Sequence, residues 1–199
     1  MIVERARWLG IFTLCLLPFL WLVFAATTAT LGPDPAEAVM HVTGEWSLRM
    51  LVLTLLVSPL RRLSGWQGVL KFRRMLGLYA FFYSCVHLVS FCQFYVGWEP
   101  AQLAEELIER PYITVGFTAW LLMLPLALTS TRGMQRRLRR NWLRLHRAVY
   151  AAGLLACVHL FWQSRSDIGE ALLYLLVVCA LLGWRLKRYI DRRSPALAH

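Results

Sequence analysis

Three histidines lie in or beside long apolar stretches and are the residues best suited to chemistry. His87 lies within the run 76–98, and His146 and His159 both lie within the run 142–162. Ionisable side chains inside a membrane are costly and usually face partners in the interior of a helix bundle. Neutral imidazole is a good axial ligand of haem iron. The histidines therefore predict a haem held between two helices.

These histidines also have a structural interpretation. An intramembrane histidine can hydrogen-bond to a neighbouring helix without any cofactor, and this alternative stays open for all three. The other two histidines are less suited to bind iron, because His41 falls in or near a loop and His199 in the C-terminal tail. All five cysteines lie in apolar runs and none forms a CxxC, so we interpret them as small core residues.

The composition is typical of a polytopic membrane protein. Of the 199 residues, 58% are hydrophobic and only 17% are charged. The net charge of +11 does not indicate nucleic-acid binding, because the basic residues fall between apolar runs and form no single basic face. Six runs approach the ~20 residues that a membrane span needs: 8–29, 41–60, 75–96, 112–131, 146–163 and 168–186.

These runs predict an all-α membrane bundle of six transmembrane helices. We expect one haem-binding domain over 1–193, with its core at about 41–163, and a loose tail at 194–199. The first run is long for a signal peptide and lacks a clear cleavage site, so it is interpreted as a retained span with a kink near Pro18. The connecting loops are short, and no GxGxxG, P-loop, HExxH or GxSxG motif is present. We therefore expect no substrate catalysis by the chain itself.

The distribution of charge predicts the orientation of the six spans. If the spans alternate, 19 of the 22 Lys and Arg residues fall on one side, and the other side has Arg49, Arg110 and Arg165 with nine of the eleven acidic residues. Basic residues favour the cytoplasmic side of a membrane. Both termini are therefore predicted to be cytoplasmic, and Arg49 is expected to pair with Glu45 or to reach a haem propionate.

Helix geometry places two of the histidines at one depth. His87 is twelve residues past Met75 and His159 thirteen past His146, so both lie roughly 18–20 Å along their helices, beyond the midplane toward the outer side. His146 itself stands at the cytoplasmic mouth of its span. It lies ~140° from His159 around an ideal helix, a mismatch that a kink near Gly153 or a frayed start at His146 would repair.

A second, inner haem would need a partner for His146. The matching position on the helix of His87 is fourteen residues earlier, at Arg73, with Arg74 beside it. Neither arginine is a usual haem ligand. The two arginines could instead hold haem propionates, a flavin phosphate or a quinone head group. The sequence leaves these choices open.

Five short segments resemble a known family. They are 59–62 (PLRR), 72–79 (FRRMLGLY), 110–116 (RPYITVG), 125–130 (PLALTS) and 142–146 (WLRLH). Together they are similar to the MsrQ family, the haem-binding membrane subunits of bacterial periplasmic methionine sulfoxide reductase systems, and the similarity covers about 32–162. This family belongs with the ferric reductase-like transmembrane domains and is related to the membrane parts of NADPH oxidases.

The resemblance implies a function and a set of cofactors. It implies haem b bound through His87, His159 and His146, with one haem expected and a second as a further candidate. FMN and a quinone are the other candidate cofactors. Electrons would pass from quinol or a cytosolic flavin reductase, across the bacterial inner membrane, to a periplasmic molybdopterin enzyme that reduces methionine sulfoxide in oxidised proteins. The larger oxidases have a fourth histidine where this chain has Arg73.

Two other functions are compatible with the residues. A quinol-oxidising cytochrome b anchor of another respiratory complex would share the haem but bind a different catalytic subunit. A haem-free transporter or scaffold would keep the histidines for structure alone, although no internal repeat or acidic ion site supports that reading.

Overall fold

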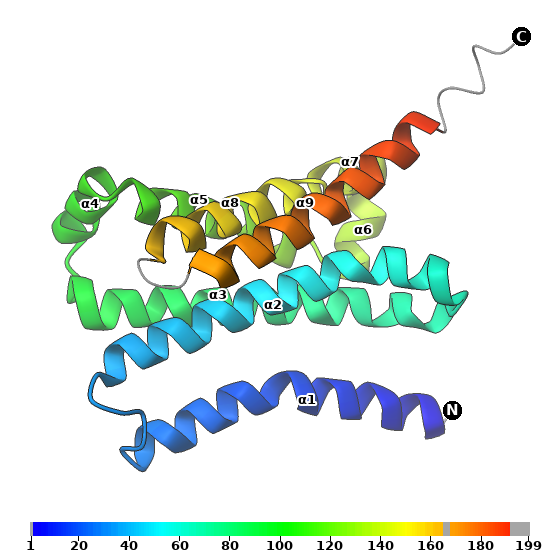
Figure 1. Ribbon diagram of the computed structural model, residues 1–199. Coiled ribbons are helices and arrows are strands. Elements are labelled where there is room, and N and C mark those ends of the chain that lie inside the picture. The colour runs from blue at the N-terminus through cyan, green and yellow to red at the C-terminus, as the bar shows by residue number, and fades with distance from the viewer. Residues whose placement is uncertain (1, 165–167, 192–199) are drawn as a thin grey trace, which may run out of the picture.

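The structure is a computed structural model that describes residues 2–164 and 168–191 (Figure 1). The predicted all-α class is confirmed, and these residues contain no strand. The predicted tail at 194–199, and Arg165 with it, lie outside the described residues. The elements are α1 (Ile2–Thr27), α2 (Pro35–Ser64), η1 (Gln67–Val69), α3 (Leu70–Phe91), η2 (Cys92–Val96), α4 (Pro100–Glu109), α5 (Pro111–Leu128), α6 (Arg132–Leu138), α7 (Arg140–Leu145), α8 (Ala148–Gln163) and α9 (Ile168–Asp191).

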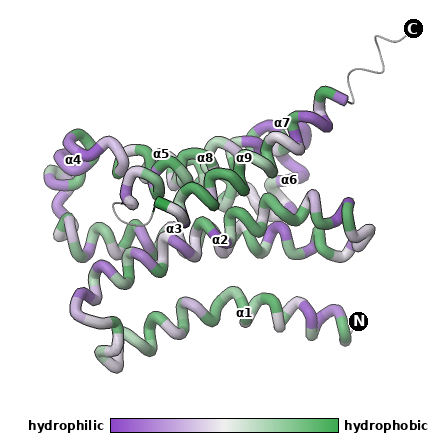
Figure 2. The backbone as a smooth tube through the Cα atoms, viewed as in Figure 1, coloured by the Kyte–Doolittle hydropathy of each residue, from purple (hydrophilic) through white to green (hydrophobic). Residues whose placement is uncertain are grey.

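Five segments of the described chain are long and apolar enough to cross a membrane: Val3–Thr27, Gln67–Val96, Pro111–Leu128, Arg140–Gln163 and Ile168–Asp191. They coincide with five of the six predicted spans. The remaining prediction, 41–60, lies within α2, which has 30 residues but is too polar to qualify by composition. The predicted count of six is therefore not confirmed. Figure 2 shows hydrophobic residues along the middle of the bundle and hydrophilic ones near its ends.

Helix α2 lies at the centre of the bundle. It begins where the Asp34 side chain accepts a hydrogen bond from the Glu37 backbone N–H at 2.9 Å, and it ends at Gly65, whose φ of 70° suits glycine. Its buried face includes Leu51 and Leu55. Helices α3, α8 and α9 all pack against α2, and α5 lies along α8 (Figure 1).

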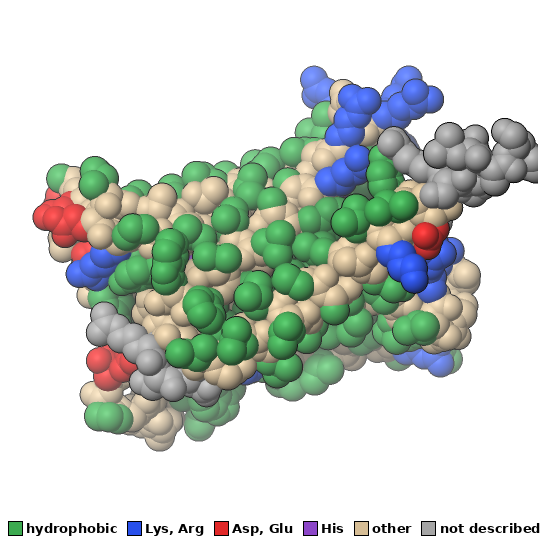
Figure 3. Space-filling model, turned by 45° about the horizontal axis from the view of Figure 1, so that its top comes forward, with side chains coloured by type: hydrophobic (Ala, Val, Ile, Leu, Met, Phe, Trp, Pro, Cys, Tyr) green, Lys and Arg blue, Asp and Glu red, His purple; other side chains and the backbone are tan. Residues whose placement is uncertain are grey.

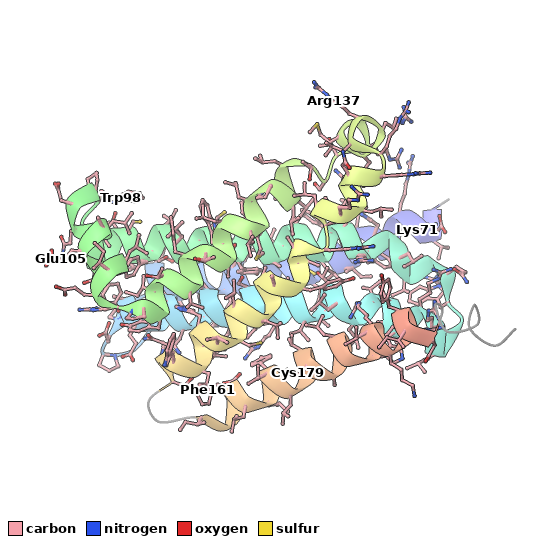
Figure 4. The ribbon with its side chains drawn as sticks, turned by 90° about the horizontal axis from the view of Figure 1, so that it is seen from above. Lys71, Trp98, Glu105, Arg137, Phe161 and Cys179 are labelled. Carbon is pink, nitrogen blue, oxygen red and sulfur yellow. The ribbon has the colours of Figure 1, made fainter. Side chains whose placement is uncertain are left out.

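The two ends of the bundle carry opposite charge (Figure 3). We call the end that holds α4 and the start of α2 the acidic end, and the end that holds α6 and α7 the basic end. Both ends of the described chain lie at the basic end (Figure 1). Figure 4 shows the same polarity, with Trp98 and Glu105 at the acidic end and Lys71 and Arg137 at the basic end.

Two tyrosines of α3 fasten α1 to the bundle. Tyr83, which is fully buried, donates a hydrogen bond to the Cys15 carbonyl at 2.7 Å and accepts one from the Phe19 backbone N–H at 3.2 Å. These two backbone groups would bond to each other in a regular helix, and Pro18 lies between them. Tyr79 donates to the Phe12 carbonyl at 2.9 Å. Much of the rest of α1 is exposed.

Replacing Tyr83 with Phe is expected to loosen α1. The change removes both hydrogen bonds that the hydroxyl makes to α1, so the free energy of unfolding should fall by about 2 kcal/mol. Thermal unfolding in detergent measures this loss. Tyr79→Phe is the matched control, because it removes a single hydrogen bond and should cost about half as much. Equal effects of the two changes would contradict the double role of the Tyr83 hydroxyl as donor and acceptor.

Candidate metal centre

The structure brings His87 of α3 and His159 of α8 together near the acidic end of the bundle. Their ring centroids are 6.3 Å apart and their planes are 82° to each other. The part of α8 that carries His159 is marked in Figure 4 by Phe161, two residues further along. The two residues are far apart in sequence, so it is the packing of α3 and α8 around α2 that brings the rings this close.

A backbone carbonyl and a side-chain hydroxyl of α2 hold the His87 ring. Its Nδ1 lies 3.1 Å from the Met40 carbonyl oxygen and 3.3 Å from Thr43 Oγ1. Thr43 Oγ1 donates to the Val39 carbonyl at 2.7 Å, so its remaining role toward His87 is that of an acceptor. Both neighbours therefore favour a proton on Nδ1. This tautomer leaves Nε2 with a lone pair for a metal.

His159 is held in the same way from α5. Its Nδ1 lies 2.7 Å from the carbonyl oxygen of Tyr112, which accepts the Nδ1 proton. Pro111 begins α5 directly before Tyr112, and its fixed φ suits the first turn of a helix. The carbonyl that orients His159 is thus set by the start of α5, and Nε2 is again the nitrogen left to bind a metal.

Both histidines line one cavity of about 500 Å³. Apolar residues such as Leu48, Trp120 and Met123 line part of it, whereas Glu37, Arg110 and other polar residues lie toward the acidic end. Most of the lining residues come from α2, α3, α4, α5 and α8, and Tyr95 comes from η2. A cavity that is apolar inside and polar at one end suits a flat hydrophobic ligand with a polar edge.

The residues present fit a haem better than a bare metal ion. Among the described residues no three His, Cys, Asp or Glu side chains form a metal-binding group. A haem supplies four nitrogens of its own and needs only two axial ligands from the protein. Metal–imidazole bonds of about 2 Å would place two collinear ring centroids about 6 Å apart, which agrees with the observed 6.3 Å.

His146 lies apart from this pair. It falls between α7 and α8 and not within α8, which agrees with the frayed start that the sequence suggested. Its ring stacks on Trp142 at 3.9 Å, and its Nδ1 lies 3.1 Å from the Trp142 carbonyl oxygen. Trp142 in turn donates to the Thr129 carbonyl at 3.0 Å. The His146 ring is therefore held in place at the basic end, and its Nε2 takes no part in these contacts with Trp142.

The arginines near His146 differ in their surroundings. Arg73 is partly buried and donates a hydrogen bond to Ser58 Oγ at 3.5 Å, and its charge is close enough to interact with the His146 ring. Arg74 is exposed. The sequence did not single out Arg185 as a site residue. In the structure its charge is close enough to interact with that of Arg73, and its guanidinium lies 5.5 Å from the centre of the Tyr150 ring. No carboxylate in the described chain forms an ion pair with Arg73 or Arg185. A charged residue within an apolar run was the signal that could have identified Arg185.

Arg49 forms an ion pair and does not line the cavity. Its Nη2 lies 2.8 Å from Glu45 and 3.6 Å from Glu170, and its Nε donates to the Tyr174 hydroxyl at 3.0 Å. The guanidinium also lies over the Trp46 ring at 5.1 Å. Of the two roles that the sequence left open, the structure supports pairing with Glu45, and the network joins α2 to α9.

We expect Arg49→Gln to weaken the contact between α2 and α9 without affecting a bound haem. The ion pairs are about one-third exposed, so the loss in unfolding free energy should be about 1 kcal/mol. Haem content per chain and the melting temperature in detergent test this together. Loss of haem in this variant would show that Arg49 acts on the cofactor.

Comparisons with known proteins show the family of the chain. Residues 43–157 match the ferric reductase like transmembrane component family. The chain is also 50% identical over 174 residues to a protein of Xanthomonas axonopodis pv. citri, covering 87% of this chain and 80% of that protein. That relative is named protein-methionine-sulfoxide reductase heme-binding subunit MsrQ. The chain belongs to the MsrQ family.

Other MsrQ proteins show similar agreement. The MsrQ of Xanthomonas campestris pv. campestris strain 8004 is 51% identical over 177 residues, with 88% of this chain and 81% of that protein covered. The MsrQ of Azospira oryzae is 46% identical over 188 residues, with 94% and 81% covered. No solved structure matches the chain. The matches to MsrQ proteins extend beyond the ferric reductase-like region to most of the chain.

Proposed function

We propose that this chain is the haem-binding, electron-transfer subunit of a methionine sulfoxide reductase system. The observation that carries the proposal is the pair of rings of His87 and His159, with each Nδ1 held by a carbonyl and each Nε2 free for the iron. A b-type haem supplies one-electron chemistry when it is bound there. The chain itself would orient His87 and His159 toward the iron and shield the haem with the apolar part of the cavity.

The polarity of the bundle supports a direction of electron flow, from the basic end to the acidic end. The cavity reaches the acidic end, which we assign to the periplasm because basic residues favour the cytoplasmic side. Six spans, with α2 counted among them, would place both termini in the cytoplasm of a bacterial inner-membrane protein. Electrons would then leave toward a periplasmic molybdopterin subunit, which reduces methionine sulfoxide. Substrate chemistry would belong to that partner.

The basic end would receive electrons from quinol or a cytosolic flavin reductase. Arg73, Arg185 and His146 converge there without a carboxylate partner among the described residues, so the region suits an anionic group. The propionates of a second haem, an FMN phosphate or a quinone head group would each fit this description. Arg74, which is exposed, would act at most at the entrance.

The visible spectrum of the detergent-purified protein, expressed with haem supplied, tests this proposal. We expect a low-spin b-type spectrum when the protein is oxidised and when it is reduced with dithionite, and reoxidation of the reduced haem by the catalytic partner in the presence of methionine sulfoxide. A colourless protein would overturn the haem subunit and favour a scaffold or transporter. A haem that the partner does not reoxidise would favour the anchor of another respiratory complex.

A further inference from the structure

The His87 ring lies against a glycine of α2. A Cβ atom built on Gly44 would be 3.2 Å from Cε1 and 3.3 Å from Nδ1 of His87. Contacts of this length require the ring to move by a few tenths of an ångström. The Met40 carbonyl that accepts from His87 is four residues earlier, so it also accepts the backbone N–H of Gly44 within α2.

The His159 ring meets a glycine of α5 even more closely. A Cβ atom on Gly116 would be 2.7 Å from Nδ1, 2.8 Å from Cε1 and 2.9 Å from Cγ of His159. Distances below 3.0 Å are sterically forbidden unless the ring shifts. The carbonyl that accepts from His159 belongs to Tyr112, again four residues before the glycine.

The two histidines are thus held by the same local arrangement on different helices. In a helix, a side chain covers the turn on the N-terminal side of its own Cα, so a side chain at position i+4 would cover the carbonyl of residue i. Glycine at that position leaves the carbonyl open to a second donor and leaves room for the imidazole ring. The pairs Met40–Gly44 and Tyr112–Gly116 both meet this requirement.

We propose that Gly44 and Gly116 are positioning residues that hold the two axial imidazoles with their planes nearly perpendicular. Each glycine sets one ring, since each ring rests on its own helix and donates to that helix's carbonyl. The angle of 82° follows from how α2 and α5 present these two surfaces. The inference rests on the proposed haem at His87 and His159 and adds the orientation of its ligands.

Perpendicular axial planes have a spectroscopic signature in ferric haem. Each imidazole plane then interacts with a different iron d orbital of π symmetry, so these orbitals stay close in energy. The low-spin EPR signal becomes strongly anisotropic, with a high largest g value. When the planes turn toward parallel, the orbitals separate and that g value falls. The signal therefore reports ring orientation separately from electron transfer.

The test compares three glycine-to-alanine variants of the full chain: Gly116→Ala, Gly44→Ala and Gly153→Ala. Gly153 is the matched control, because it is also a buried glycine of a membrane helix, but its Cβ would meet only aliphatic side chains at ordinary contact distances, namely Leu55 at 3.6 Å, Val178 at 3.8 Å and Leu51 at 4.0 Å. Loss of an outer-shell partner of a metal ligand typically weakens binding 10- to 100-fold. We expect Gly116→Ala to lower haem affinity by about that factor and Gly44→Ala by about tenfold or less.

The EPR spectrum separates the outcomes. We expect a high largest g value in the wild type and in Gly153→Ala, and a lower value in Gly44→Ala. Gly44→Ala requires only a small shift of the His87 ring, so we expect this variant to fold even if Gly116→Ala does not. If the wild-type haem gave the signal of parallel planes, the inference would be overturned and the proposed haem would stand. The same holds if Gly44→Ala matched Gly153→Ala in both haem affinity and the largest g value. A wild type without haem would overturn the proposed function itself.

Discussion

His159→Ala and His87→Ala are each expected to abolish the low-spin haem of the purified protein. Each change removes one of the two axial ligands that the proposed site offers, and the described chain places no third His, Cys, Asp or Glu with them as a metal-binding group. A haem that stayed would be high-spin, with one open axial position. Reduced-minus-oxidised spectra and haem per chain measure the loss. We expect haem content to fall at least tenfold in either variant.

His146→Ala provides the comparison for these two variants. His146 is outside the cavity, at the basic end, so its loss should leave the low-spin haem between His87 and His159 unchanged. If the wild type binds two haems per chain, His146→Ala should bind one. A variant His159→Ala that kept its low-spin spectrum would contradict the assignment of the axial ligands, whatever the stoichiometry.

Arg185→Met is expected to destabilise the bundle, for a reason that lies in α2. Pro59 has no N–H, so the carbonyl of Leu55, four residues earlier, has no helical partner. Arg185 reaches across from α9 and donates to this carbonyl through Nη2, and its Nη1 donates to the Leu181 carbonyl at 3.1 Å. Removing the guanidinium leaves a buried carbonyl unpaired, which should lower the free energy of unfolding by about 2 kcal/mol.

A double-mutant cycle with Pro59→Ala tests this explanation. Alanine restores the missing N–H, so the Leu55 carbonyl regains a partner within α2 and Arg185→Met should cost less in that background. Arg188→Met is the control on the same helix, because the Arg188 guanidinium lies over the Trp184 ring at 5.1 Å and this contact should contribute about 0.5–1 kcal/mol. Equal costs of Arg185→Met in both backgrounds would show that its main role is elsewhere.

Hydropathy and spacing predicted the helices well because membrane spans have strict length and polarity requirements. The predicted runs at 112–131 and 168–186 correspond to α5 and α9 within a few residues at most ends. The axial rise per residue of an α-helix likewise predicted that His87 and His159 lie at one depth, and the structure brings their rings together. The short helix α4 was missed, although Pro100 at its first turn and the spacing of Leu103 and Leu107 are typical of an amphipathic helix.

Contacts made by backbone carbonyls were not predictable in the same way. A carbonyl has no signature in the sequence, so nothing in the residue types connects Met40 with His87 or Tyr112 with His159. The bond from Arg185 to the carbonyl of Leu55 joins residues 130 positions apart. Only Pro59 hinted that such a carbonyl needed a donor. The sequence therefore located the candidate ligands but not the groups that orient them.

The carbonyl acceptors also have a thermodynamic consequence for a bound haem. An imidazole that donates its Nδ1 proton to a carbonyl is a more basic ligand, and a more basic ligand stabilises ferric iron over ferrous iron. His87 and His159 each have such an acceptor, at 3.1 Å and 2.7 Å. If they are the axial ligands, as proposed, both would lower the reduction potential of the haem. A haem with a low reduction potential is a strong electron donor when it is reduced. The two carbonyl oxygens would thus make electron transfer to a periplasmic acceptor more favourable in free energy.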